Sequence, residues 1–189
     1  MEIELDRHTI LFFYHTLVDL YRDTEDPITL GHSDAMIQVC VERPFVDIYD
    51  YVPFPDTLLK ASVLLETIIN FHPFADGNKR VALLSMFFFL YWNGYDFSIP
   101  EDADEYTIEI AKGKHDLKNI YTWVCEHTKR GIYSIVRNLL IAQSLASSSI
   151  LKSDLMAQFN MTVLFTGYPF MFFQTLIAKK KRQKKSTAK

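Results

Sequence analysis

The feature that most constrains the fold is an apolar run at residues 81–92, VALLSMFFFLYW. A helix that is apolar on every side must be buried, because it has no face to give to water. The run is too short to cross a bilayer, which takes about 20 apolar residues. Asn93 and Gly94 follow it, and residues of this kind commonly end helices. We therefore predict a helix at the centre of the domain, covered by other segments with one apolar face each.

Five further segments have the apolar periodicity or the capping residues of such covering helices. They span residues 6–21, 33–43, 56–69, 101–112 and 117–129, with Ser33 and Asp56 as candidate N-caps. Residues 45–55, FVDIYDYVPFP, alternate loosely and are rich in aromatic and β-branched side chains, which favours a short strand or hairpin. Residues 95–99 are expected to be a short extended return. The expected fold class is mainly α, a compact helical domain with one small β element that ends near Arg130.

Length and cysteine content narrow the class of protein. A chain of 189 residues can bury one sizeable core and is too short for two ordinary domains. Its two cysteines, Cys40 and Cys125, lie far apart, which excludes a disulfide scaffold and a zinc ribbon and suits a reducing compartment. The first eight residues contain acids and no apolar signal region, so we expect a cytoplasmic protein.

The net charge of −3 hides an uneven distribution. Residues 179–189 contain seven of the 20 basic residues and no acid, which leaves residues 1–178 with 13 basic and 23 acidic residues and a charge of −10. An acidic body is not typical of a domain that coats nucleic acid, so no direct nucleic-acid binding is expected.

The polar segment between the predicted central helix and the helix before it contains the chemistry. Residues 71–80, FHPFADGNKR, combine an imidazole, a carboxylate, a glycine, an amide and two cations. The free N–H groups of a helix start bind anions, and Lys79 and Arg80 add positive charge there. A carboxylate beside an anion site, Asp76, suggests a bridging divalent cation, and magnesium is the best candidate. His72 can accept a proton near neutral pH. Together these groups suit phosphoryl transfer from a nucleotide to a hydroxyl.

Each residue taken separately has a plainer interpretation. An Asp-Gly-Asn sequence is often only a turn, a Lys-Arg pair is often a solvated helix start, and a histidine beside proline is usually structural. The combination of all of them at this spacing, between two core helices, favours the functional interpretation.

The segment HPFADGNKR resembles the signature of the Fic/Doc superfamily, His-x-Phe-x-Asp/Glu-Gly-Asn-Gly/Lys-Arg. The resemblance extends in helix order from about Arg7 to Arg130. It implies a Fic/Doc-type helical bundle in which a small β-hairpin flap positions the target protein. The flap residues would be Val46, Asp47, Ile48, Tyr49, Asp50, Tyr51 and Val52.

The resemblance also implies a role for each motif residue. His72 would be the general base, Asp76 the magnesium ligand, and Phe74 an anchor of the loop in the core. The groups that bind the phosphates of ATP, or of another nucleoside triphosphate, would be Gly77, Asn78, Lys79 and Arg80.

Two positions of the chain are similar to the Doc branch. The Fic motif of AMP-transferring enzymes has glycine where this chain has Lys79, and a second arginine where this chain has Leu83. The Doc branch is associated with transfer of the terminal phosphate, so the resemblance implies a toxin that phosphorylates a protein hydroxyl, with a translation factor as a candidate target. A small antitoxin would be its second partner, because a Fic-type autoinhibitory pattern is not found. Two alternatives stay open: AMP transfer to a protein, and a Fic-fold binding module that has lost catalysis.

Residues 131–189 extend past the region of resemblance. We expect a helical extension, in which residues 155–178 contain no charge and the basic tail 179–189 follows. An uncharged run followed by cations is typical of a C-terminal membrane anchor. Gln158, Asn160 and Pro169 make the run only moderately apolar, so three alternatives remain: a helix folded onto the domain, an oligomerisation arm, or an out-of-frame tail.

Overall fold

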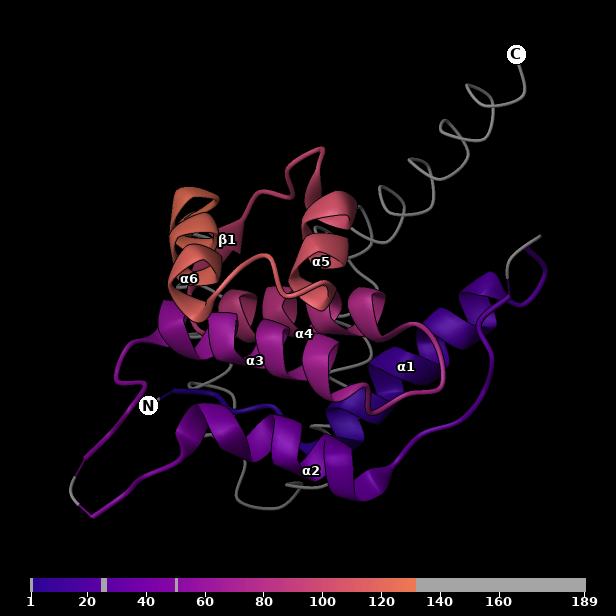
Figure 1. Cartoon of the computed structure of the whole chain (residues 1–189), viewed down its shortest axis with the longest axis horizontal. Helices are drawn as coiled ribbons and strands as arrows, with labels where there is room; N and C mark the ends of the chain where they lie inside the picture. Colours follow the sequence, from indigo (N-terminus) through magenta and orange to yellow (C-terminus); the bar gives the residue numbers. More distant parts are fainter. Residues whose placement is uncertain (1, 25–26, 50, 132–189) are drawn as a thin grey trace, which may run out of the picture. The chain divides into compact units, whose positions relative to one another are not determined.

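Helix α4, Asn78–Trp92, lies at the centre of the computed structural model, which describes residues 2–24, 27–49 and 51–131 (Figure 1). Ten consecutive residues of this helix, 81–90, are buried, as its apolar sequence predicts. Helix α3, Thr57–Phe71, packs alongside it. The other helices of the described ranges are α1 (Arg7–Tyr21), α2 (Asp34–Glu42), α5 (Ala103–Ala111) and α6 (Leu117–Glu126), and a 3₁₀ turn, η1, lies at Arg43–Phe45. The mainly helical fold class is therefore confirmed.

Several of these helices have an N-cap residue whose side-chain oxygen accepts a hydrogen bond from a first-turn N–H group. Asp6 accepts a hydrogen bond from the Thr9 N–H at the start of α1. The predicted caps Ser33 and Asp56 do the same for α2 and α3, with the N–H groups of Met36 and Leu59. Such caps satisfy N–H groups that have no helical acceptor. They explain why the starts of these three helices were predictable to within about a residue.

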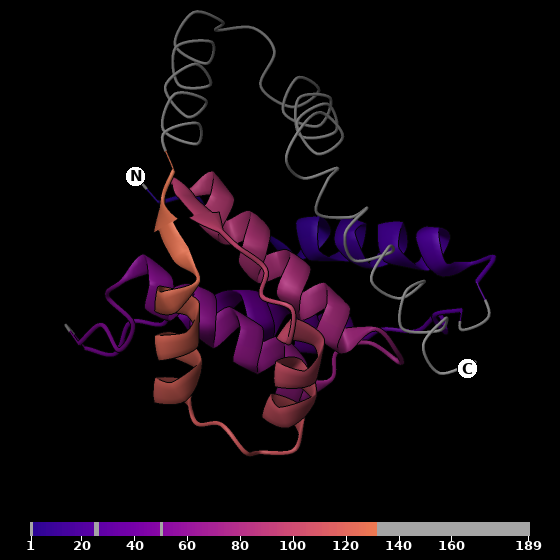
Figure 2. The same cartoon turned by 90° about the horizontal axis from the view of Figure 1, so that it is seen from above.

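The two-stranded sheet includes the extended return predicted at 95–99, but its second strand was not predicted. Strands β1 (Tyr95–Phe97) and β2 (Thr128–Arg130) pair antiparallel, with Asp96 opposite Lys129 (Figure 2). The predicted helix over 117–129 was therefore too long, because α6 ends at Glu126. Pairing with a strand about 30 residues earlier decides the conformation of residues 128–130, and local periodicity does not contain that information.

Among the described residues, the hairpin predicted at 45–55 is present only as one isolated β-bridge, without strands on either side of it. Ile48 and Tyr51 form one antiparallel bridge, in which each N–H donates to the carbonyl of the other at 3.0 Å. The bridge closes a tight turn that begins with Tyr49 at φ 46°. Pro53 and Pro55 follow closely, and a proline has no N–H to continue a ladder.

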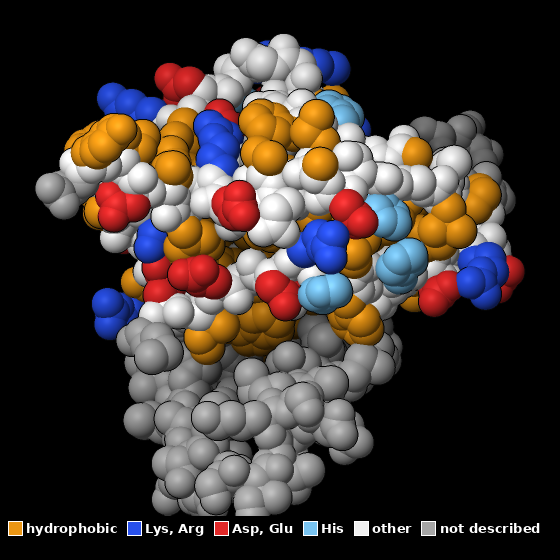
Figure 3. Space-filling model, turned by 90° about the horizontal axis from the view of Figure 1, so that it is seen from below, with side chains coloured by type: hydrophobic (Ala, Val, Ile, Leu, Met, Phe, Trp, Pro, Cys, Tyr) orange, Lys and Arg blue, Asp and Glu red, His pale blue; other side chains and the backbone are white. Residues whose placement is uncertain are grey.

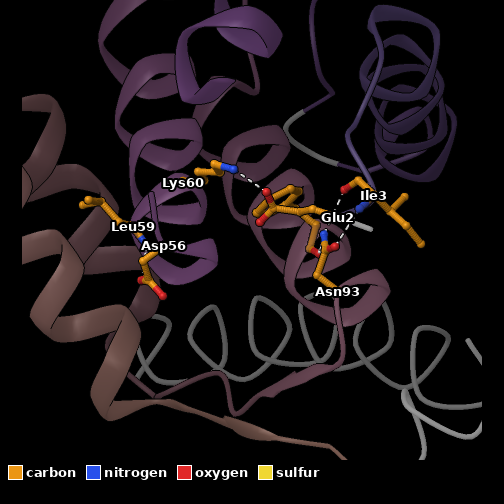
Figure 4. A network of polar contacts seen from close by, with 7 residues as sticks. Glu2, Ile3, Asp56, Leu59, Lys60 and Asn93 are labelled. Atoms are coloured by element: carbon orange, nitrogen blue, oxygen red, sulfur yellow. Dashed lines mark hydrogen bonds and ion pairs between the residues drawn. The ribbon is translucent and has the colours of Figure 1, made fainter. Parts of the chain in front are cut away.

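The N-terminal segment is fixed to the far end of α4 (Figure 4). The Asn93 side chain accepts a hydrogen bond from the Ile3 N–H at 2.7 Å and donates one to the Ile3 carbonyl at 2.8 Å. Its amide also donates to the Phe89 carbonyl at 2.8 Å, and Glu2 forms an ion pair with Lys60 of α3. Asn93 was predicted only to end the helix, and it also holds the N-terminal segment at Ile3 against the end of α4.

The predicted helical extension at 131–189, its uncharged run and its basic tail lie outside the described residues, apart from Gly131. Across the ranges that the structure describes, none of the helices is both long enough and apolar enough to cross a membrane.

Candidate active site

A six-residue loop, 72–77, connects α3 to α4, and its first and last residues have left-handed backbone. His72 follows the last residue of α3 at φ 49° and ψ 56°, and Gly77 precedes α4 at φ 81°. Glycine adopts this region at little cost, whereas a side chain there is strained. A Cβ added to Gly77 would also lie 3.4 Å from Ile28. These two turns place both helix ends at one surface.

The His72 side chain is exposed, and its Nδ1 lies 3.1 Å from the Asn70 carbonyl oxygen. A carbonyl can only accept a hydrogen bond, so this contact assigns the ring proton to Nδ1. Nε2 then carries the free lone pair. This tautomer is the one that a general base needs, because the basic nitrogen is the one left for a ligand.

Phe74 and Tyr14 form the inner support of the loop. Phe74 is 3% exposed, and its ring stacks on that of Tyr14 with 4.3 Å between centroids. The Tyr14 hydroxyl accepts a hydrogen bond from the Gly31 N–H at 3.0 Å and donates to the Thr29 carbonyl at 2.8 Å. Burial raises the pKa of Tyr14, and the nearby Asp76 carboxylate raises it further, although the hydrogen bond with Gly31 lowers it. Tyr14 therefore stays a neutral donor and acceptor.

Residues 31–33 hold the loop from its other side. The Ser33 N–H donates to the Pro73 carbonyl, and the Ala75 N–H donates to the Gly31 carbonyl, both at 2.8 Å. His32 and Phe74 form an isolated antiparallel bridge between them. Gly31 permits this approach, since a Cβ there would lie 3.0 Å from that of Ala75. The sequence analysis did not predict these contacts of residues 31–33 or the role of Tyr14. Gly31 was the one sequence signal of the close approach.

The Asn78 side chain is buried and turned back onto the loop. Its amide oxygen accepts the Phe74 N–H at 3.0 Å, and its Nδ2 donates to the Phe74 carbonyl at 2.7 Å. The residue predicted to bind phosphate thus uses the oxygen and one N–H of its amide on the backbone. Its second N–H and its own backbone N–H, in the first turn of α4, are the groups that can face a ligand.

The cations and the carboxylate lie at the start of α4. Lys79 is exposed, and the Arg80 guanidinium lies 4.6 Å from the centre of the Tyr21 ring. The first-turn N–H groups of α4 have no acceptor within the helix, and together with these cations they suit a phosphate. Asp76 is half-buried, and its Oδ1 accepts the Gly77 N–H at 2.6 Å.

A magnesium ion fits this donor set. Mg²⁺ is commonly held by one or two carboxylates together with substrate phosphates, and Asp76 is such a carboxylate beside an anion site. No group of three or more histidine, cysteine or acidic side chains that could hold a metal by itself occurs among the residues that the structure describes. A metal here would therefore depend on the nucleotide for most of its ligands.

The predicted flap exposes its apolar side chains to solvent. Tyr49 is 99% exposed at the tip, and the other exposed large apolar side chains are Val46, Ile48, Tyr51 and Val52. Asp47 is also exposed, and Asp50 is outside the described residues. The Arg43 guanidinium connects the base of the flap to α3, through Glu66 at 2.7 Å and the Thr67 hydroxyl at 2.6 Å.

An exposed imidazole and a helix start with unpaired first-turn N–H groups, brought together by one loop, would suit a protein that handles phosphorylated ligands. Comparison with known proteins is more specific. Residues 3–90 match the model of the Fic/DOC family. The toxin Doc of Mycolicibacterium smegmatis is 29% identical over 113 residues, which cover 53% of this chain and 87% of that protein. These two similarities support a place for the chain in the Fic/Doc superfamily, in its Doc-like branch.

Proposed function

We propose that the chain is a Doc-like toxin that transfers the γ-phosphate of ATP to a hydroxyl group of a target protein. The observation that carries this proposal is the 3.1 Å contact of His72 Nδ1 with the Asn70 carbonyl oxygen, which leaves Nε2 as the ring's acceptor on the loop that leads into α4. A base and an anion site within nine residues, 72–80, are what such a transfer requires. The similarity to a protein named toxin Doc supports the biological role.

Leu83 favours phosphate transfer over AMP transfer. It is 2% exposed and packs in the core, at the position where the AMP-transferring Fic motif has a second arginine. The cations of the motif are therefore Lys79 and Arg80, both in the first turn of α4. Without the second arginine, less of the site is available to hold the nucleotide in the orientation that presents its α-phosphate.

The proposed reaction uses these groups in the following way. His72 Nε2 takes the proton of the target hydroxyl, and the oxygen forms a bond to the γ-phosphorus of ATP. The bond from the γ-phosphorus to the oxygen that bridges it to the β-phosphate breaks, and ADP leaves. His72 then returns the proton to solvent. Lys79, Arg80 and the first-turn N–H groups of α4 bind the charged oxygens of the transferred group. Magnesium held by Asp76 would neutralise phosphate charge.

Labelled ATP separates the three possible outcomes. We expect label from γ-labelled ATP on a protein acceptor and none from α-labelled ATP. Label from the α position only would instead identify an AMP-transferring enzyme, and a lack of transfer from either position would favour a binding module. His72→Asn should abolish transfer and keep the fold, because asparagine tolerates left-handed backbone and is not a base. His115→Ala, which removes a histidine paired with Glu109, is the matched control and should leave transfer intact.

The same proposal includes a small antitoxin as a partner. Expression of the chain alone should arrest growth, and His72→Asn should release the arrest. Co-expression of a small neighbouring open reading frame should also restore growth and should retain the chain in an affinity purification. Arrest by His72→Asn at equal expression would contradict the enzymatic basis of toxicity.

A further inference from the structure

A groove of about 770 Å³ lies beside the candidate active site and is not used by the reaction described above. Its walls are the N-terminal segment 4–8, one side of α2, and residues 42–46 at the base of the flap. Phe71, the last residue of α3, completes the lining and immediately precedes His72. The groove thus extends from the flap to the residue next to the candidate base.

The acids of the groove lack partners of opposite charge. Glu4, Asp6 and Glu42 line it, and within the described ranges none of them forms an ion pair with a lysine or arginine. Asp6 caps α1, and Glu42 accepts a hydrogen bond from the neutral Gln38 side chain at 2.7 Å, so neither of these contacts brings a cation to the carboxylate. The groove also contains one imidazole, His8.

The two arginines that line the groove are already neutralised from outside it. Arg7 lies 3.4 Å from Asp34, and Arg43 lies 2.7 Å from Glu66. Neither acid partner belongs to the lining. The groove therefore presents an excess of unpaired carboxylates, in keeping with the charge of −10 on residues 1–178.

Apolar side chains stand among these acids. Val39 of α2, Val46 and Phe71 all line the groove, and they are 42%, 39% and 41% exposed. Figure 3 views the face that α2 presents, and hydrophobic and charged side chains are interspersed over it. A surface of this composition fits a segment that brings both apolar side chains and cations.

We propose that this groove docks a basic segment of the target protein, with apolar residues between its lysines and arginines, and so delivers a neighbouring hydroxyl to His72. The inference rests on the proposed function and specifies its substrate class. Its grounds are the unpaired carboxylates, the exposed apolar residues between them, and the continuity of the groove with both the flap and the end of α3.

Binding can be measured without catalysis. The probes are two fluorescent peptides with a central serine and the same leucine positions, one with lysine and the other with glutamate at the remaining sites. Anisotropy titrations with the full chain should give an affinity roughly tenfold higher for the lysine peptide. Salt near 1 M, where the Debye length falls to about 3 Å, should remove most of that preference.

Charge reversal locates the effect. The double variant Glu4→Lys, Glu42→Lys changes two exposed side chains and should lower the affinity for the lysine peptide roughly tenfold. The control Glu101→Lys, Glu126→Lys makes the same change of net charge at exposed sites outside the lining and should leave the affinity within about twofold. Thermal melts of both variants check that each is folded.

The outcomes separate this inference from the function on which it rests. Equal affinities for the two peptides, or equal losses in the two double variants, would overturn the docking role. A third outcome would also overturn the docking role. If the groove variant weakens binding of the antitoxin but leaves the affinity for the lysine peptide unchanged, the groove would be assigned to the antitoxin. Selective binding of the lysine peptide, without His72-dependent transfer from ATP to any acceptor, would support the groove and refute the proposed reaction.

Discussion

Removal of the Tyr14 hydroxyl should destabilise the loop between α3 and α4, although Tyr14 lies in α1 and is not one of the groups proposed for catalysis. In Tyr14→Phe the stacking on Phe74 remains, but the Gly31 N–H loses its acceptor and the Thr29 carbonyl loses its donor. A hydrogen bond contributes about 0.5–1.5 kcal/mol net, and a buried group left unsatisfied costs about 1–3 kcal/mol. We expect the free energy of unfolding to fall by about 2–3 kcal/mol, and Tm by roughly 10 °C.

The loss should be local as well as global, because Gly31 and Ser33 bind the loop through their backbones. Native-state hydrogen exchange at the Ala75 and Ser33 amides should accelerate more than exchange in the core of α4. Urea unfolding gives the global term, and Tyr49→Phe, which removes a hydroxyl from a residue that is 99% exposed, is the control. A loss below about 0.5 kcal/mol in Tyr14→Phe, with unchanged exchange at Ala75, would refute the reasoning.

Three further predictions test other parts of the loop and core. Gly77→Ala should cost about 1–2 kcal/mol by urea unfolding, because its φ of 81° strains any side chain and the new methyl meets Ile28; equal stability would contradict this. Asn78→Ala should cost about 2–4 kcal/mol, since it leaves both backbone groups of Phe74 unpaired, and a loss under about 1 kcal/mol would show that water replaces the amide. Burial raises the pKa of Cys40 to about 12, so thiol labelling of the native protein near pH 8 followed by peptide mass spectrometry should leave Cys40 unmodified until the chain unfolds.

Part of the fold follows directly from the sequence because its causes are local. The apolar run 81–92 has no face for water, so the burial of its residues 81–90 could be predicted without knowledge of their neighbours. The caps Ser33 and Asp56 act on residues three positions further along the chain. Strand β2 was missed because its cause is distant, since residues 128–130 are extended through pairing with residues 95–97.

The candidate site divides in the same way. A motif of fixed spacing indicated His72, Asp76, Lys79 and Arg80 as groups for chemistry, and the structure places all four on one loop or in the first turn after it. Tyr14 read only as one member of an apolar helix face, because the partners of its hydroxyl lie 15–17 residues away in another segment. The apolar periodicity of a helix predicts that a side chain is buried, but it does not predict the hydrogen-bond partners of that side chain.

The motif residues themselves have two kinds of role. Phe74, Gly77 and Asn78 are buried and give the loop its shape, whereas His72 and Lys79 are exposed and can meet a ligand. A match to the motif is therefore largely a match to a backbone conformation that holds a base beside a helix N-terminus. Under the proposed function, that conformation would serve transfer of either the α- or the γ-phosphorus, so it would not by itself select the reaction. Selection would then depend on which phosphate the cations hold in line, and hence on Lys79 and on the apolar side chain of Leu83.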